Sequence, residues 1–292
     1  MVPPIARPEA LPPYVDDAGS IPNEENRKAN RQLVAVPREL AAIVAAGSEG
    51  APGAAACAVE NLDAWAQANA LLTRGNNFAS TRQLLRYSTG LNMGVFRLRG
   101  RGVSLRPETL AWLESLAIFA AEQFEGRYDK HQIVDNLYVW SGVTAASFSL
   151  VASSPSLKAY ADGVWRRAID AIEPLGGVAA ERRRGRRALS YHTYYLSAVL
   201  WLANIRKKQG HPVSPDDQNA IQSLEDFIVK QVCSSSRTLP GVAAQQIRPT
   251  ASDYKSAFYL ADEVFRMRIQ ECGLKKPPDY DAFLGGKIES LN

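Results

Sequence analysis

The sequence contains few of the residues that hold metal ions. It has three cysteines and three histidines among 292 residues, and no CxxC pair or cluster of histidines accompanies the cysteines. We therefore expect no metal site and no cofactor, and histidine-based catalysis has few candidates. The cysteines, Cys57, Cys233 and Cys272, permit at most one internal disulfide, and their number does not indicate a compartment.

Long apolar runs are also absent. No segment reaches the ~18 consecutive apolar residues of a membrane-spanning helix, so we expect no membrane partner. The opening stretch, MVPPIARPEALPPYVDD, lacks the apolar core of a secretory signal. Two interpretations stay open: a cytosolic protein, or a mature form that carries a start Met.

Alternating strand patterns are missing too, and helical periodicity takes their place. Pro107 and Glu108 form a favourable helix start, and apolar side chains then recur every three or four residues. Ser214 followed by Pro215 is a strong helix N-terminus. The pattern predicts helices over residues 61–72, 81–98, 106–125, 132–151, 156–172, 186–207, 214–233 and 253–271.

The chain divides into a short arm and one helical domain. Residues 1–23 are rich in proline and predict an extended or loosely docked arm. Residues 24–292 predict a single all-α domain of about eight to ten antiparallel helices. A bundle, a superhelix or a closed α/α toroid would satisfy this pattern, and the lack of a fixed-length repeat counts mildly against a solenoid.

Positive charge is in mild excess and clustered. The net charge is +4, and the basic residues gather at Arg182–Arg187 and again at Arg97, Arg99 and Arg101. Such clusters suit a partner that carries negative charge. No helix-turn-helix, RNA-binding or zinc signature is present, so we expect no nucleic-acid partner.

The basic run leads directly into several phenols. In a helix over residues 186–207, Arg187, Tyr191 and Tyr194 fall at i, i+4 and i+7 and share one face, whereas His192 and Tyr195 point elsewhere. A guanidinium beside a phenol favours its anion, so we expect a lowered pKa that suits proton transfer. The alternative is that the tyrosines belong to the core and the arginines to a solvated turn.

Two other stretches are candidates for a polar site. Asp135 and Asn136 lie in an otherwise apolar segment, where they either line a polar cavity or form a helix-start pair. His131, just upstream, is predicted to be an exposed helix-start residue. The loop RGNNFAS at residues 74–80 is either a mobile lid or an ordinary connection.

Together these stretches resemble an alginate lyase of the fifth polysaccharide-lyase family. WAQANALLTRGNNFASTRQLLRYSTG resembles that family's helix, lid loop and next helix, with one extra loop residue. VDNLYVWSG resembles its Asn-Asn-His-x-Tyr-Trp motif. RRALSYHTYYL resembles its Arg-Arg-Ala-Leu-x-Tyr-His-Asn-Tyr motif, which is the most specific of the three. The resemblance covers about residues 57–205 well and is faint beyond residue 214.

The resemblance implies an α/α toroid with a deep cleft, and β-elimination at a uronate. By position, Tyr194 would be the catalytic acid, and also the base in a syn elimination. Arg187 would help to neutralise charge, Asn136 would pair with the uronate carboxylate, and Arg82 would stand for the lid-region lysine. Further expected substrate contacts are Asn77, Tyr191, Trp140, Asp135 and His192. The family is usually periplasmic or secreted, and we expect a monomer with an acidic polysaccharide as its partner.

The sequence departs from the family motif at one important position. Leu137 stands where the family has the histidine that helps to neutralise the carboxylate and acts as a base on the opposite face. His131 lies about 120° round the helix from Leu137 and almost two turns away, so it does not substitute. Val139 replaces the motif tyrosine, with Tyr138 one step earlier, and Asp135 adds a negative charge.

Three hypotheses follow from these features. The first is a polyuronate lyase in which Tyr194 makes both proton transfers, which favours polymannuronate over polyguluronate and admits polyglucuronate. The second is a polyuronate-binding protein of the same fold with little or no turnover. The third is an unrelated all-helical interaction protein whose arginines form a solvated or nucleic-acid-facing patch.

Overall fold

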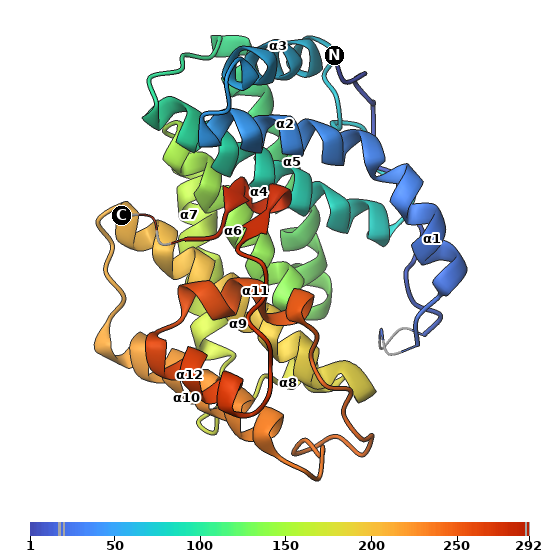
Figure 1. Cartoon of the computed structure of the whole chain (residues 1–292), viewed down its shortest axis with the longest axis vertical. Coiled ribbons are helices and arrows are strands. Elements are labelled where there is room, and N and C mark those ends of the chain that lie inside the picture. Colours follow the sequence, from blue (N-terminus) through green and yellow to red (C-terminus); the bar gives the residue numbers. More distant parts are fainter. Residues whose placement is uncertain (17–18, 20, 290, 292) are drawn as a thin grey trace.

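A computed structural model describes residues 1–16, 19, 21–289 and 291, and nearly all of its regular structure is helical (Figure 1). The helices of these ranges are α1 (Glu24–Leu33), α2 (Ala35–Glu49), α3 (Ala54–Gln67), α4 (Phe78–Gly100), α5 (Pro107–His131), α6 (Asn136–Val151), α7 (Pro155–Asp170), α8 (Ala179–Arg182), α9 (Ala188–Lys208), α10 (Pro215–Cys233), α11 (Ala251–Leu260) and α12 (Glu263–Glu271). A 3-10 turn, η1 (Gly185–Arg187), precedes α9. A second one, η2 (Ala282–Leu284), lies near the C-terminus.

The helices form two curved layers. Helices α4, α6, α9 and α11 pack one against the next, while α5 and α7 cover α6, and α10 covers α9. The inner helices α4 and α6 run parallel, because the residue numbers of their contacting pairs increase together on both helices. Thr89 hydrogen-bonds Thr144 at 2.8 Å and, a turn later, Asn92 donates to Ser147 at 3.2 Å. This alternation of inner and outer helices is the expected α/α toroid.

Close approach between the layers depends on a residue without a side chain. A Cβ added at Gly142 of α6 would stand 2.5 Å from Val164 Cγ1 of α7. A methyl group at that distance forces one helix away from the other. Gly142 therefore fixes the spacing between an inner helix and its outer cover.

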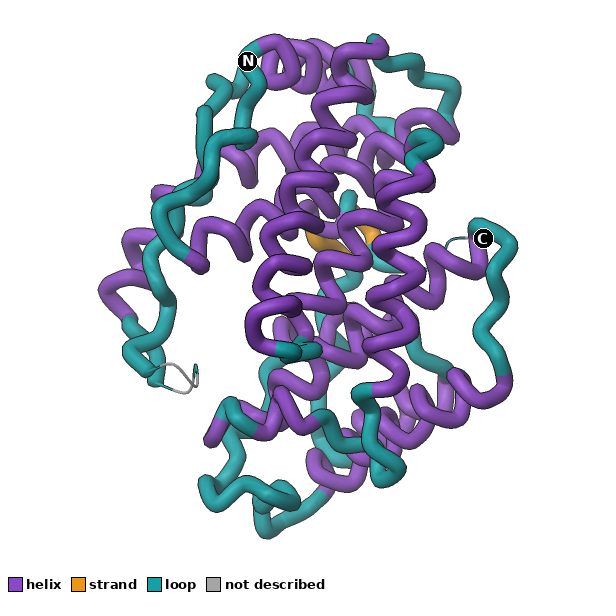
Figure 2. The backbone as a smooth tube through the Cα atoms, turned by 180° about the vertical axis from the view of Figure 1, so that it is seen from behind, coloured by secondary structure: helices purple, strands orange, loops and turns teal. Residues whose placement is uncertain are grey.

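The C-terminal segment returns from α12 to the inner layer. Strands β1 (Tyr280–Asp281) and β2 (Gly286–Lys287) pair antiparallel around η2, which packs on α4 and α2. Arg97 of α4 donates to the Gly285 carbonyl at 2.6 Å. Figure 2 shows this small ribbon at the centre of the fold, seen between the helices.

The N-terminal residues lie along α3 and the start of α4. The Val2 amide donates to Asn61 Oδ1 at 2.6 Å, and Trp65 Nε1 donates to the Val2 carbonyl at 2.9 Å. Further along, the Ala10 amide donates to Ser80 Oγ at 3.1 Å. The segment is thus held by backbone hydrogen bonds to side chains of the domain.

Several element boundaries differ from the sequence prediction. The segment predicted over residues 253–271 is two helices, because Asp262 caps α12 by accepting from the Phe265 amide at 2.7 Å. Helix α5 extends to His131, which lies at a helix end and not at a start. Helix α6 begins after Asp135, and α9 begins after Arg187. Helices α1, α2 and α8 and the two short strands were not among the predicted segments.

The cysteines differ in state. Cys233, at the end of α10, is bonded to Cys272, which follows α12, with Cα atoms 4.9 Å apart. Cys57 is free and exposed. Within the described ranges, no helix combines the length and the apolar character required to cross a membrane, and no group of three potential metal ligands is found.

Candidate active site

The centre of the candidate site is a contact among an arginine, a tyrosine and a carboxylate. Arg187 is the residue directly before α9, and Tyr194 lies two turns into that helix. The Tyr194 hydroxyl donates to Asp253 Oδ1, and Arg187 Nη2 lies 3.6 Å from the same oxygen. Asp253 belongs to the first turn of α11, so the parallel packing of α9 and α11 makes the contact.

The second oxygen of Asp253 has a different set of partners. Oδ2 accepts from the Thr250 amide at 2.7 Å and from the hydroxyls of Thr250 and Ser190, each at 3.1 Å. The Thr250 contacts form a capping box that starts α11. Since the side chain is only 4% exposed, its two oxygens are fixed in orientation. Oδ1 contacts Tyr194 and Arg187, and Oδ2 accepts the hydrogen bonds that start α11.

Tyr191 links this centre to the rest of the basic run. Its ring meets that of Tyr194 edge-on, with centroids 5.6 Å apart. The guanidinium of Arg184 lies 4.7 Å from the Tyr191 centroid, and that of Arg187 lies 5.9 Å from it. Cations over an aromatic face are attracted by its π electrons. The predicted shared face of Arg187, Tyr191 and Tyr194 is therefore present as one connected cluster.

The N-terminal segment contributes a residue that the sequence did not indicate. Arg187 Nη1 donates to the Tyr14 hydroxyl at 2.5 Å, and its guanidinium lies 5.3 Å from the Tyr14 ring centroid. Nearby, Gly19 packs so closely that a Cβ there would stand 2.9 Å from the Tyr191 hydroxyl. Only a long-range contact brings Tyr14 here, so no local pattern could have identified it.

The pKa of Tyr194 does not follow the sequence prediction. Burial, and then the charge and hydrogen bond of Asp253, raise this pKa well above 10.0, and Arg187 opposes the change only in part. Burial likewise raises the pKa of Tyr191. The expectation of a lowered phenol pKa beside Arg187 is wrong, because it considered the cation without the desolvation or the carboxylate. Tyr194 is a protonated phenol at neutral pH, as a general acid must be.

Asp135 and Asn136 form a buried network beside this cluster. Asp135 caps α6 by accepting from the Tyr138 amide at 3.0 Å, and its carboxylate pairs with Arg127 at 2.7 Å and with Arg184 at 3.0 Å. It is 1% exposed. The helix-start interpretation therefore holds for Asp135, and the predicted contact of Asp135 with substrate is not supported, because its oxygens are already paired.

Asn136 is held by a buried glutamate. Glu181 Oε1 accepts from the Asn136 amide nitrogen at 2.5 Å and from its side-chain Nδ2 at 3.0 Å. Burial and the nearby charge of Asp135 raise the pKa of Glu181 to about 7. This hydrogen bond fixes the orientation of the Asn136 side chain, which is 4% exposed.

His192 is a structural residue. Its Nδ1 is 2.7 Å from the Ala188 carbonyl, and its Nε2 accepts from the Val178 amide at 3.1 Å. Burial lowers its pKa to about 4, so the ring is neutral at neutral pH. With both nitrogens engaged and 0% exposure, His192 has no atom to offer a sugar, and its predicted substrate contact is wrong.

Tyr138 and its neighbours on α6 are held within the fold. The buried Tyr138 donates to Glu125 Oε2 at 2.9 Å and receives a hydrogen bond from Arg167 of α7, which directs it toward the outer layer. Leu137 and Trp140 are partly buried and pack against the core. The aliphatic side chain of Leu137 carries no atom that could replace the histidine nitrogens.

The remaining predicted contacts lie near α4. Asn77 caps α4 and donates to the Ala10 carbonyl at 2.8 Å, which ties the loop at residues 74–80 to the N-terminal segment. Arg82 is partly buried and lies one turn before Arg86 on α4. Its positive charge acts on Arg86. In the described part of the chain no hydrogen bond or ion pair joins either residue to Tyr194, so their roles stay predictions.

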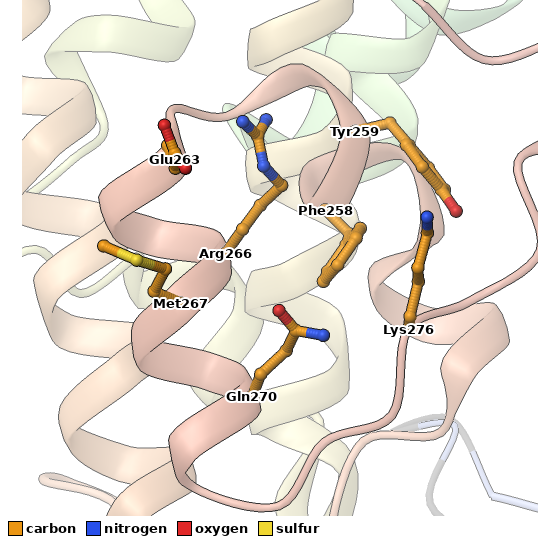
Figure 3. Close-up of a pocket in the computed structure, with 7 residues that line it drawn as sticks. All are labelled: Phe258, Tyr259, Glu263, Arg266, Met267, Gln270 and Lys276. Carbon is orange, nitrogen blue, oxygen red and sulfur yellow. The ribbon is translucent and has the colours of Figure 1, made fainter.

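Two surface cavities lie away from this cluster. One, of about 280 Å³, lies between α11 and α12. Figure 3 shows Arg266, Met267 and Gln270 of α12 along one side, with Phe258 and Tyr259 of α11 and Lys276 along the other. A second, of about 330 Å³, borders the disulfide and includes Leu189, Gln246 and Arg248. Neither is lined by Tyr194, so neither is assigned to the site.

Comparisons with known proteins agree on a family. Residues 12–238 match the family model described as alginate lyase. A polysaccharide lyase of Stenotrophomonas maltophilia is 26% identical over 98% of this chain and 88% of its own length. An alginate lyase of Pseudomonas syringae pv. tomato is 22% identical over 73% of this chain, which spans only 58% of that relative. The solved structure of alginate lyase A1-III with a tetrasaccharide superposes with a TM-score of 0.79 at 18% identity, covering 99% of this chain and 85% of that one.

Proposed function

The chain belongs to the alginate lyase family, and from this membership we propose that it cleaves an acidic polyuronate by β-elimination. In that reaction a base removes the proton on C5 of a uronate, and an acid protonates O4 as the glycosidic bond breaks. The observation that carries the proposal is the contact of Arg187, Tyr194 and Asp253, which joins the first two turns of α9 to the first turn of α11. Helix N-terminal ends also favour anions.

Each residue of the cluster has a distinct part in this reaction. Tyr194 exchanges protons with C5 and O4. Arg187 offsets the negative charge that develops on the C6 carboxylate, and such preorganised electrostatics are usually the largest catalytic term. The side-chain amide of Asn136, which Glu181 holds in place, is proposed to donate to the same carboxylate. Arg82, Trp140, Tyr191 and Asn77 are proposed to contact neighbouring sugars.

The leucine at position 137 restricts the substrate. A leucine can neither carry a proton nor stabilise an anion, so both proton transfers fall to Tyr194 on one face of the sugar. Such a syn elimination requires that the C5 proton and O4 lie on the same side of the ring. Polymannuronate is therefore favoured over polyguluronate, and polyglucuronate is an additional candidate.

The test is a comparison of polymers. The protein is incubated with polymannuronate, polyguluronate and polyglucuronate, and the ultraviolet absorbance of the unsaturated uronate product is followed. We expect product from polymannuronate and little from polyguluronate. Absence of product from all three would disprove the lyase function.

A variant pair tests the role of Tyr194. Tyr194→Phe removes the proton donor and acceptor, so we expect turnover to fall by about 10²–10⁴-fold or more. Tyr280→Phe is the matched control, since Tyr280 is 41% exposed and lies outside the cluster. An unchanged rate in Tyr194→Phe would refute the assignment.

A second candidate function has its own support. Leu137 removes a catalytic group, whereas the basic and aromatic cluster around Tyr191 is intact. These features suit a polyuronate-binding protein with little turnover. Binding of polymannuronate by calorimetry without any unsaturated product would favour this alternative.

We also propose a periplasmic or secreted location and a monomeric state. The Cys233–Cys272 disulfide supports the location, because disulfides persist mainly in oxidising compartments. Fractionation of the expressing cell and sedimentation of the purified protein are the respective measurements.

A further inference from the structure

A neutral phenol cannot accept a proton until it gives up its own. Tyr194 is protonated at neutral pH, and its hydroxyl proton is donated to Asp253 Oδ1. A histidine that could accept a proton instead is missing at position 137. Asp253 Oδ1 is thus the hydrogen-bond acceptor that the structure provides for the phenolic proton.

We propose that Asp253 is a proton relay that acts through Tyr194. This inference rests on the proposed lyase function and deepens it. Asp253 is a positioning residue, because its carboxylate would act on the reaction through the phenol that it contacts. The geometry gives it two tasks, which are to hold the phenol in one orientation and to take its proton while the phenol acts as a base.

The proton balance of the step is closed. As the C5–H bond breaks, the Tyr194 oxygen takes that proton and its original proton passes to Asp253 Oδ1. The electrons of the C5–H bond form the C4–C5 double bond, and the C4–O4 bond breaks. O4 then takes a proton from Tyr194, and Asp253 returns its proton to the phenol. No oxidant, reductant or metal ion is required.

The surroundings of Asp253 suit this role. Its Oδ2 is occupied by Thr250 and Ser190, which leaves Oδ1 for the phenol. Arg187, at 3.6 Å from Oδ1, offsets the negative charge that Asp253 would otherwise place beside an anionic sugar. A proton-transferring side chain that is activated by an adjacent base is a recurrent catalytic arrangement.

The competing interpretation is that Asp253 only caps α11. The matched control for it is Thr250→Ala, which removes the cap hydroxyl but leaves the carboxylate beside Tyr194. A capping role predicts that both variants lose stability and activity together. A relay predicts that Thr250→Ala lowers the melting temperature yet keeps kcat within about threefold of wild type.

The decisive variant is Asp253→Asn, assayed on polymannuronate. We expect kcat to fall by about 10²–10⁴-fold, the usual range for a lost proton acceptor, with KM nearly unchanged. Asp253→Glu restores a carboxylate and should recover part of the rate. A kcat for a folded Asp253→Asn within threefold of wild type would overturn the relay.

A measurement on the wild-type protein keeps the inference testable even if Asp253→Asn does not fold. The phenolic proton exchanges with solvent, whereas the C5 proton does not. The relay moves the phenolic proton during C5 abstraction, so kcat should be lower in D2O. A rate equal in H2O and D2O, together with a substantial isotope effect from deuterium at C5, overturns the relay. Absence of any wild-type product instead refutes the lyase function itself.

Discussion

Three arginines of the run, Arg182, Arg184 and Arg187, differ because each meets a different acid. Arg182 forms a pair of 2.5 Å hydrogen bonds with Glu173. Arg184 reaches the buried Asp135, and Arg187 reaches Asp253 and Tyr14. Spacing along the sequence could single out Arg187 through its tyrosines, but the acids that orient these cations come from other segments of the chain.

Two buried groups near the site predict opposite effects of pH on the free energy of unfolding. Burial lowers the pKa of His192 from 6.5 to about 4, so stability is lost as the pH falls through that range. Burial raises the pKa of Glu181 from 4.5 to about 7. The folded protein retains that proton longer than the unfolded chain, so stability is lost as the pH rises through that range.

Replacement of Glu181 separates these effects. Glu181→Gln keeps an oxygen for Asn136 but no longer titrates. The destabilising effect of His192 on acidification is then no longer offset by Glu181. We expect the free energy of unfolding to fall more steeply than in wild type on acidification from about pH 7 to 4.5, by about 1 kcal/mol per pH unit. Urea titrations across this range measure it, with the exposed Glu122→Gln as control. Parallel curves for all three proteins would contradict the role of Glu181.

At the scale of elements, each predicted segment proved helical, but its limits were often wrong, and α1, α2 and α8 were missed. Periodicity placed eight helical segments correctly in kind, because apolar side chains at every third or fourth position record a buried face. The break between α11 and α12 was missed although Asp262 is a good cap, since the apolar pattern continues across it. Asp135 was recognised as a possible cap, and its two arginine partners were not.

Close packing of α6 against α7 makes a prediction about glycine. Gly142→Ala places a methyl group 2.5 Å from Val164 Cγ1, so we expect a loss of about 1–3 kcal/mol in the free energy of unfolding. Gly163→Ala in α7 is the matched control, because a Cβ there meets nothing within 4 Å. It should stabilise by up to about 1 kcal/mol through helix propensity. Chemical denaturation of both variants checks the difference, and equal stabilities would contradict the packing argument.

At the scale of the whole molecule, contacts from four distant segments meet around one cluster. Tyr14 comes from the N-terminal segment, Asp135 precedes α6, Arg187 and Tyr194 belong to the start of α9, and Asp253 opens α11. Arg184 joins α6 to α9 by pairing with Asp135 while covering Tyr191. Parallel inner helices make this possible, because they bring their N-terminal ends to the same side.

The disulfide is predicted to stabilise the molecule without forming part of the site. Cys233 and Cys272 are 39 residues apart in sequence and join the ends of α10 and α12. A reductant, or the Cys233→Ser/Cys272→Ser pair, should lower the free energy of unfolding by about 2–4 kcal/mol. Cys57→Ser is the control, since that thiol is free and exposed. Unchanged melting temperatures with and without reductant would contradict this prediction.

The sequence by itself determined the all-α class, the toroid through its family motifs, and the face shared by Arg187, Tyr191 and Tyr194. These features depend on local periodicity and on short motifs, which lie within single continuous stretches of the sequence. Tertiary structure alone decided the partners: Asp253 on Tyr194, Tyr14 on Arg187, Glu181 on Asn136, and the buried position of His192. Hydrogen bonds between segments 45 to 173 residues apart have no local signature, and desolvation depends on all the neighbours at once. The pKa of Tyr194 is therefore raised, whereas the sequence predicted that it would be lowered.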